Sequence, residues 1–480
     1  MKAQRGQAAI NLLLLTATLA SGQMYSHSIV YPTILESRSI NGTKAIKLND
    51  DITLNLVPTD VISSTFVLST ATKLNLEHKE IDTTNIGQSI YHDEIFMAAV
   101  SMQDVGGTIE MTGIVGERLR IEPLPFSGRT SSGVRPHHLF YARNILARDD
   151  VIVPRSVNNT SRSDRRKKPF QRFSNFAVVE VYVLIDVLFS AHFPKDADAI
   201  NYLAVTIAAV NLRYRSVKRI EIKFRLVGML RLSSELEEEF VTKYGTYIDG
   251  QPTLLRLQMF CYRSGLDKAD VRYFITGRDI TGVYRGRMNA IMGGFAYVGG
   301  LCSLDGVAIG EDTPGLYAGV DIMAHELAHS MGCVHDGEGA RTEIPGHKGS
   351  TAPECAAYRG YLMSYSRNGG KNHHKLSPCC EEQIKIFLRL VADECVEETF
   401  NVTQIITRRL FLPGHWITPQ RYCKLKQPSL KIASPYTLMA NSKCKLQCLY
   451  AGSYNRPVEY EALDGMRCEG GRWCEKGVCI

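Results

Sequence analysis

Residues 325–336 read His-Glu-Leu-Ala-His-Ser-Met-Gly-Cys-Val-His-Asp. In a helix, His325 and His329 lie one turn apart, so both imidazoles project from the same face. Gly332 lets the chain leave the helix through backbone angles that other residues resist, which returns His335 to the same point. Three imidazoles and one vacant position are typical of a catalytic zinc site, because structural zinc sites fill all four positions with protein ligands.

Glu326 directly follows the first histidine, so its carboxylate is expected beside the vacant position. There it can take a proton from a water molecule on the metal and later pass it to a leaving amine. HExxH alone occurs by chance in some chains, but Gly332 and His335 at fixed offsets make coincidence much rarer. A core helix with two satisfied histidines is the alternative interpretation. The motif predicts a hydrolytic zinc site with Glu326 as general base.

The segment resembles the active-site helix of the metzincin zinc peptidases, and Asp336 after the third histidine is typical of their adamalysin or reprolysin branch. The resemblance implies an α/β (α+β) domain with a twisted, mostly parallel sheet, an antiparallel edge strand and a Met-turn. Residues 360–366 (GYLMSYS) resemble that turn, and Met363 is expected to form an apolar floor beneath the imidazoles. Asp336 is expected to hold the chain around His335 rather than act as a base.

Hydrophobic periodicity upstream of this motif alternates between strand and helix patterns. The order resembles the upper part of a metzincin domain, and the resemblance extends over about 175–397. The predicted elements are a strand at 176–189, a helix at 196–214, a strand at 219–232, a helix at 233–244 and a strand at 270–276.

Residues 293–302 (GGFAYVGGLC) precede the motif. In the family this stretch is an edge strand, and a substrate backbone adds to it as a further strand. Its glycines permit close approach, although a flexible turn is the alternative. Because such an edge binds extended polypeptide, an endopeptidase is favoured over an esterase or amidase for small molecules. The residues expected at this edge are Gly293, Gly294, Tyr297, Val298 and Gly299.

The family resemblance also implies a calcium site near the end of the catalytic domain. The matching positions are Glu180, Asp270, Glu398 and the carbonyl of Cys395. Oxygen ligands of this kind suit Ca²⁺. Each of these acids is equally compatible with an ordinary salt bridge or a surface position.

Residues 1–22 are typical of a secretory signal peptide, with two basic residues before a short apolar run and small residues after it. Residues 23–168 contain no cysteine and alternate in hydrophobicity, which predicts a β-rich propeptide; a permanent N-terminal domain is the alternative. The segment ends in a basic cluster of the kind that proprotein convertases cut. These residues are Arg165, Arg166, Lys167 and Lys168.

Several members of the family hold latency through a propeptide thiolate on the zinc, and residues 23–168 have no thiol to offer. We therefore expect latency through steric cover or another ligand. Thiol-modifying reagents are expected not to activate the zymogen, as measured by peptide cleavage before and after treatment. Activation by such a reagent would contradict this prediction.

The thirteen cysteines suit an oxidising compartment. The catalytic domain, residues 169–399, holds seven of them, an odd number. Cys379 and Cys380 are adjacent and need different partners, because a vicinal bridge is strained. Cys333 lies between His329 and His335, and the three histidines already provide enough protein ligands for a catalytic zinc. A structural disulfide is therefore favoured for Cys333. The resemblance implies that Cys302 pairs with Cys395.

Residues 400–480 form a small module with six cysteines. It resembles the cysteine-rich segments of secreted relatives with thrombospondin motifs. Disulfides are favoured over zinc binding in this compartment, and 15 connectivities are open. Holding a protein substrate near the cleft is a plausible role for this module.

The net charge of +7 over 480 residues is small, and no segment alternates basic and aromatic residues, so no nucleic-acid partner is expected. No stretch after the signal has 18 uninterrupted apolar residues, so no membrane span is expected. The mature protein is expected to be an extracellular monomer that acts on protein substrates. Four sequons, which are compatible with a glycoprotein, lie at Asn41, Asn158, Asn159 and Asn401.

Residues 31–42 (YPTILESRSING), the helix motif, the turn and the short tail together resemble the salivary reprolysin-like metalloproteases of ticks. This resemblance implies host blood and matrix substrates such as fibrinogen and fibronectin, and an anti-haemostatic role. One alternative is a secreted binding protein that acts through its tail and has a vestigial catalytic domain. Another is a peptidase that processes short hormones. Glu326 and all three histidines are retained, which disfavours the vestigial domain.

Overall fold

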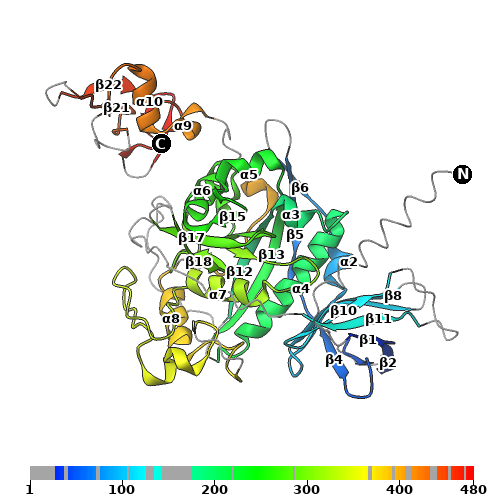
Figure 1. Cartoon of the computed structure of the whole chain (residues 1–480). Helices are drawn as coiled ribbons and strands as arrows, with labels where there is room; N and C mark the ends of the chain where they lie inside the picture. Colours follow the sequence, from blue (N-terminus) through cyan, green and yellow to red (C-terminus); the bar gives the residue numbers. More distant parts are fainter. Residues whose placement is uncertain are drawn as a thin grey trace, which may run out of the picture. The chain divides into compact units, whose positions relative to one another are not determined.

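The chain divides into two compact units, and a computed structural model gives the arrangement within each (Figure 1). The first unit comprises Met1–Thr70, His78–Cys261 and Leu266–Gln404, and the second comprises Ala71–Glu77, Tyr262–Gly265 and Ile405–Ile480. The structure describes residues 27–36, 42–71, 76–104, 108–125, 134–142, 176–218, 220–284, 287–365, 370–391, 395–405, 412–432, 440–451, 456–469 and 472–479.

The central feature of the first unit is a sheet that has seven strands in the described part of the chain, in the order β19-β20-β16-β12-β13-β5-β6. Strands β20, β16, β12, β13 and β5 run parallel, and β19 is antiparallel to β20. Apolar runs such as FAVVEVYVLI in β12 suit a sheet buried on both faces. The strands are β5 (Ile62–Ala71), β6 (Leu76–Glu80), β12 (Phe176–Ile185), β13 (Glu221–Arg231), β16 (Val271–Thr276), β19 (Gly294–Ala296) and β20 (Val307–Glu311).

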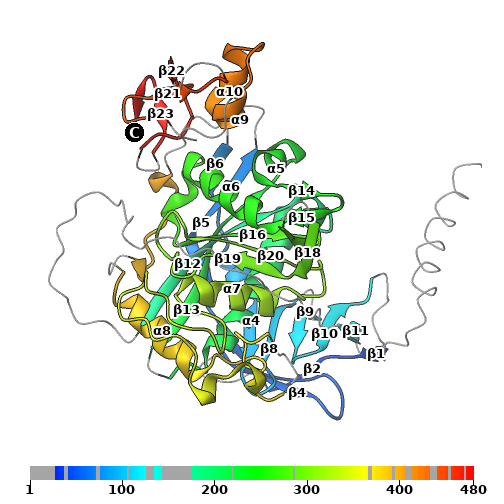
Figure 2. The ribbon, with the colours of Figure 1, turned by 60° about the vertical axis from the view of Figure 1, so that its left-hand side comes forward.

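Two long helices, α4 (Asp196–Tyr214) and α7 (Val320–Ser330), pack against each other beside this sheet (Figure 2). The hydroxyl of Tyr214 donates to the carbonyl of Ala324 at 2.7 Å. These contacts fix where α7 lies, and α7 carries the histidine motif.

The helix predicted at 233–244 is shorter in the structure. Helix α5 (Ser234–Phe240) begins after the cap Ser233 as expected but ends at Phe240, because Val241 is extended. The amide of Thr242 donates to the hydroxyl of Thr253 at 3.0 Å instead of continuing the helix. A tertiary contact therefore ends this helix.

Further elements lie between residues 187 and 388. A small sheet has the order β14-β15-β17-β18. The elements are α3 (Val187–Ser190), β14 (Lys243–Tyr244), β15 (Tyr247–Asp249), α6 (Gly250–Arg263), β17 (Ile280–Tyr284), β18 (Arg287–Met292) and α8 (Pro378–Leu388).

The N-terminal segment is β-rich, as its alternating pattern predicts. Apart from β5 and β6, its described strands form an antiparallel sheet in the order β1-β11-β10-β9-β8-β7-β4-β3-β2. The elements are β1 (His27–Val30), β2 (Thr33–Glu36), β3 (Lys44–Lys47), β4 (Thr53–Pro58), α2 (Thr84–Gly87), β7 (Ile90–Asp93), β8 (Ala98–Asp104), β9 (Ile109–Val115), β10 (Leu119–Pro123) and β11 (His137–Tyr141).

The tail has a small core that includes Tyr422, Leu446, Tyr450 and Met466, and it is crossed by disulfides. In the described residues of the whole chain, no helix is long and apolar enough to span a membrane. The tail elements are α9 (Pro413–Trp416), α10 (Pro419–Lys426), β21 (Lys445–Cys448), β22 (Val458–Glu461), β23 (Cys474–Glu475) and β24 (Val478–Cys479).

Candidate metal centre

The three predicted histidines meet at one point. The Nε2 atom of His335 lies 3.3 Å from Nε2 of His325 and 3.2 Å from Nε2 of His329. All three side chains are buried. Tetrahedral coordination with Zn–N distances of about 2.0–2.1 Å would separate such nitrogens by about 3.3–3.4 Å. The spacing therefore fits three imidazoles that share one zinc ion.

Backbone carbonyls orient two of these rings. His325 Nδ1 lies 2.8 Å from the carbonyl oxygen of Leu362, and His329 Nδ1 lies 2.7 Å from that of Cys333. Because a carbonyl only accepts, each Nδ1 carries the proton and each Nε2 presents a lone pair. Lone pairs that converge in a buried space repel one another unless a cation lies between them, so the donor set fits a divalent metal.

A left-handed turn brings the third histidine to the first two. Helix α7 ends at Ser330, and Gly332 has φ +96°. A Cβ atom at Gly332 would lie 3.0 Å from Cβ of Phe387, so both backbone angle and space favour glycine here. Cys333, within this turn, is bonded to Cys380. It therefore serves as a bridge rather than a metal ligand.

Asp336 holds the chain after the third histidine. Its amide donates to the carbonyl of Met363 at 2.9 Å, and its Oδ1 accepts from the hydroxyl of Ser377 at 2.6 Å. Ser377 also caps helix α8. Met363 is fully buried in the same core as α7. The residues of the expected Met-turn therefore contact the ligand segment through Leu362 and Met363.

The carboxylate of Glu326 lies against the edge strand. A Cβ atom built on Gly294 of β19 would lie 2.7 Å from Glu326 Oε1 and 2.7 Å from the carbonyl oxygen of Ile309. Only glycine permits this close approach. The general-base candidate and the substrate edge therefore occupy the same part of the molecule.

The residues predicted at the substrate edge lie in or next to strand β19. Strand β19 ends the described sheet, and Gly294 pairs with Gly310 of β20. Gly293 accepts from the amide of Glu311, and Gly299 donates to the carbonyl of His329, both at 2.9 Å. Tyr297 and Val298 follow the strand and are buried.

Two residues that contact the third histidine were not predicted from the sequence. The hydroxyl of Tyr365 lies 2.7 Å from His335 Nδ1, and Glu338 Oε1 lies 3.2 Å from the same nitrogen. Glu338 also pairs with Arg341. The only local signal is that Tyr365 follows Met363 by two positions and Glu338 follows His335 by three.

Replacing Tyr365 with phenylalanine is expected to reduce zinc affinity by about 10–100-fold, because it removes a hydrogen-bond partner that orients His335. Competitive titration with a fluorescent zinc chelator measures this change. Tyr358→Phe is the matched control, since the Tyr358 ring packs near Arg359 rather than a ligand. Equal zinc affinity in Tyr365→Phe and wild type would contradict the prediction.

Buried carboxylates fix the start of α7. Asp312 Oδ1 accepts from the amide of Gly319, the helix cap, at 2.8 Å. Its Oδ2 accepts from the hydroxyl of Tyr202 at 2.9 Å. Asp321, in the first turn of α7, pairs with Arg213 of α4 at 2.9 Å. These contacts connect the helix to its neighbour.

Burial raises the pKa of Asp312 to about 6, and the bonds from Gly319 and Tyr202 oppose that rise. The protonated carboxyl is therefore favoured by folding between the unfolded pKa, near 4, and about 6. The stabilisation is full below pH ~4 and is lost as pH rises through about 6. We expect the free energy of unfolding, relative to Asp312→Asn, to fall by about 1–3 kcal/mol from pH 4 to 6.5. Urea unfolding across this range measures it, and a constant difference would contradict it.

The residues proposed for calcium lie near the end of the catalytic region. Glu180 Oε1 accepts from the amides of Thr399 and Phe400, both at 2.6 Å, and Asp270 Oδ2 accepts from the amide of Glu180 at 2.9 Å. Glu398 pairs with Arg225 at 2.5 Å. Arg225 therefore competes with a calcium ion for Glu398. Calcium binding, with the carbonyl of Cys395, stays a prediction.

Six disulfide bonds form among the described cysteines, and Cys261 lies outside them. Cys302 is bonded to Cys395, as the resemblance implies. The adjacent Cys379 and Cys380 take different partners. The remaining bonds are Cys333–Cys380, Cys355–Cys379, Cys423–Cys448, Cys444–Cys474 and Cys468–Cys479.

Some predictions lie outside the described residues. These are the signal peptide at 1–22, the basic cluster Arg165 to Lys168, and the sequons at Asn41, Asn158 and Asn159. Asn401 is described, and its side chain accepts from the amide of Thr403 at 3.0 Å.

The family of the catalytic region follows from comparison with known proteins. A reprolysin model described as metallo-peptidase family M12 matches residues 175–377, which include the histidine motif, Glu326 and Met363. Residues 175–377 belong to metallopeptidase family M12. This family implies a catalytic zinc, which agrees with the histidine cluster.

Similarity between this metalloprotease and known proteins extends beyond residues 175–377. A venom metalloproteinase of the scorpion Tityus serrulatus is 26% identical over 81% of this chain and 97% of its own length. A second, from Olivierus martensii, is 28% identical over the same shares. A protein of Bombyx mori, like a disintegrin and metalloproteinase with thrombospondin motifs, is 28% identical over 56% of this chain and 39% of its own length. Among solved structures, metalloproteinase-II from Bacteroides fragilis has a TM-score of 0.34 and 11% identity, over 80% of this chain and 95% of its own.

Proposed function

We propose that this metalloprotease is a secreted zinc endopeptidase that cleaves peptide bonds in extracellular proteins. The observation that carries the proposal is the convergence of three Nε2 atoms, together with strand β19 directly against the carboxylate of Glu326, the residue after His325. Six disulfides support an oxidising compartment. Relatives described as venom metalloproteinases support release from the cell.

Each residue of the site has a separate role in peptide hydrolysis. His325, His329 and His335 would hold zinc, which when bound polarises a carbonyl and lowers the pKa of coordinated water towards about 7. Glu326 accepts the proton of the attacking water and delivers it to the leaving amine. Strand β19 binds the substrate backbone as an added strand, which requires an extended polypeptide. A mid-chain segment can lie along such an edge, so cleavage within proteins is favoured.

The proposal extends to processing. Residues 1–22 act as signal peptide, 23–168 as propeptide, 169–399 as catalytic domain and 400–480 as cysteine-rich module. A proprotein convertase cuts at Arg165 to Lys168. The disulfides and compact core of the tail support a rigid module able to hold a substrate.

The experiment is a digest of plasma and matrix proteins, including fibrinogen and fibronectin, by the mature protein. Chelator treatment and Glu326→Ala are the controls. Internal cuts that disappear in both controls support a zinc endopeptidase, and their sequences map the specificity. Cuts confined to short hormone peptides would favour a processing peptidase. The absence of any zinc-dependent cut would leave a binding role through the tail.

A further inference from the structure

In the seven-stranded sheet, here called the catalytic sheet, the edge of β13 that faces away from β12 is covered by a strand from the N-terminal segment. Strand β5 pairs parallel with β13, with Leu226 opposite Ile62 and Met229 opposite Leu68. The amide of Leu226 donates to the carbonyl of Val61 at 2.8 Å. Without β5, this side of β13 would present unpaired backbone groups, which are a template for aggregation.

The two segments also share one hydrophobic core. Val61, Ile62, Phe66, Ile90 and Ile114 of the N-terminal segment belong to the same buried cluster as the strands of the catalytic sheet. Strands β7, β8 and β9 contact helix α4. Removing the N-terminal segment would expose the apolar side chains of the catalytic domain that it covers. Exposing apolar surface to water costs about 25 cal/mol of free energy per Å².

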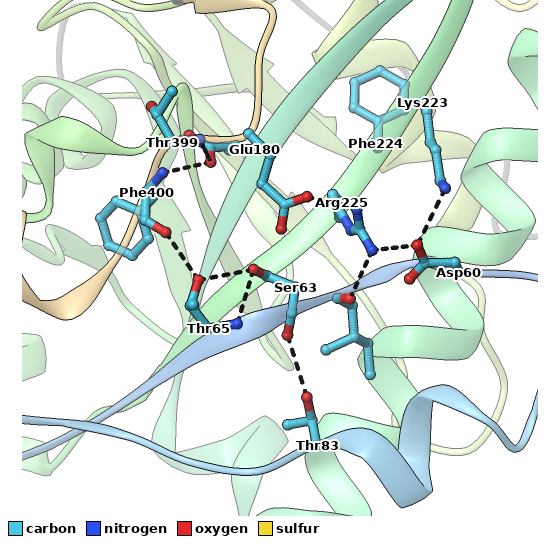
Figure 3. Close-up of polar contacts among 12 residues, drawn as sticks. Asp60, Ser63, Thr65, Thr83, Glu180, Lys223, Phe224, Arg225, Thr399 and Phe400 are labelled. Atoms are coloured by element: carbon cyan, nitrogen blue, oxygen red, sulfur yellow. Dashed lines mark hydrogen bonds and ion pairs between the residues drawn. The ribbon is translucent and has the colours of Figure 1, made fainter.

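Polar contacts cross the same boundary (Figure 3). Arg225 of β13 pairs with Asp60, which lies two residues before β5 (Figure 3), and also with Glu398. The hydroxyl of Thr65 donates to the carbonyl of Phe400 at 3.2 Å. These contacts join the N-terminal segment, the sheet and the end of the catalytic region.

A buried arginine supplies a second contact region. Arg120 of β10 donates to the carbonyl of Leu316 at 2.6 Å and is 5% exposed. Burial lowers its pKa to about 10, so it remains charged at neutral pH. Glu117, near it, lies 3.4 Å from His374. A buried charged donor is costly to leave without its partner.

We propose that residues 27–142 of the propeptide stay bound to the catalytic domain after the chain is cut between the two, as a second chain held by non-covalent contacts. Cleavage between the last strand of this segment, β11, and the first catalytic strand, β12, breaks one peptide bond and none of the contacts described above. The cut chain is then a two-chain protein whose sheet is completed by β5. The inference rests on the proposed function in one respect, which is that a convertase cuts the chain between these strands in the organism.

The test uses the full-length protein with a site for a specific protease inserted between residues 142 and 176. After complete cleavage, verified on a denaturing gel, size exclusion at about 1 µM is expected to show both fragments in one peak. Separate elution would overturn the proposal. Neither outcome depends on peptidase activity, so a failure here is distinct from a failure of the proposed function.

Hydrogen exchange gives an independent readout. Amides of residues 221–231 are expected to keep the same protection before and after the cut. Loss of protection at Leu226 upon cleavage would mean that β5 leaves β13, which would also overturn the proposal.

Variants locate the binding contacts in the cut protein. Arg120→Met is expected to raise the dissociation constant about 30-fold or more, because it removes a buried charged donor. Asp60→Ala, which is more exposed, is expected to raise it about two- to fivefold. Asp50→Ala is the matched control, because Asp50 pairs with Lys47 inside the N-terminal segment. Hydrogen exchange in β8 and β9 before cleavage verifies that Arg120→Met folds. An unchanged dissociation constant in both interface variants would overturn the assigned contacts.

Discussion

Replacing Glu326 with alanine is expected to lower kcat/KM for peptide cleavage by about 10²–10⁴-fold, the usual contribution of a positioned general base. Glu326 is buried beside the edge strand and next to His325, so its removal eliminates the proton acceptor without removing a metal ligand. Zinc content and thermal stability should therefore stay close to those of the wild type.

The measurement is the cleavage rate of a quenched fluorescent peptide, together with zinc analysis of the purified protein. Glu326→Gln retains the shape of the side chain but cannot accept a proton, so we expect a similar loss. Glu235→Gln, at an exposed position on α5, is the control and should keep full activity. Activity of Glu326→Ala within threefold of the wild type would exclude the role assigned to this carboxylate.

Replacing His335 with alanine is expected to abolish stoichiometric zinc binding. The ring is brought to His325 and His329 only by the turn at Gly332, and its Nε2 lies within 3.3 Å of both other Nε2 atoms. Two imidazoles with solvent on the remaining sides hold zinc far more weakly than three. The loss should exceed the about 10–100-fold that removal of an outer hydrogen-bond partner costs.

Zinc per chain after dialysis, measured by mass spectrometry, tests this expectation. The wild type should retain about one ion, as a catalytic site of this kind holds. His192→Ala is the matched control, because His192 is exposed and lies outside the cluster. Retention of one zinc per chain by His335→Ala would show that the three histidines do not share the ion.

Local spacing carries the prediction of the metal ligands. The four-residue interval between His325 and His329 lies within one helix, and Gly332 supplies the left-handed turn, so neither depends on distant contacts. Apolar runs likewise predict the bounds of α4 and the start of β12 at Phe176. The strand predicted to reach residue 189 ends at Ile185, because Asp186 caps helix α3. Such features are set by interactions between residues near each other in the chain.

Contacts between distant residues could not be predicted in this way. The partners of His335 at Tyr365, the approach of Gly294 to Glu326 and the early end of α5 at Phe240 each depend on a segment remote in sequence. The connectivity of the tail disulfides could not be predicted for the same reason, because several pairings satisfy the same cysteine spacing.

The sequence by itself determined the chemistry of this protein, because three histidines and a glutamate at helical spacing carry their geometry with them. Only the tertiary structure decided that β5 lies on the edge of the catalytic sheet. The pattern of β5 is compatible with any sheet that has an apolar face, and its partner β13 lies more than 150 residues further along the chain. Strand partners are chosen by packing and backbone pairing across the whole fold, which hydrophobic periodicity does not encode.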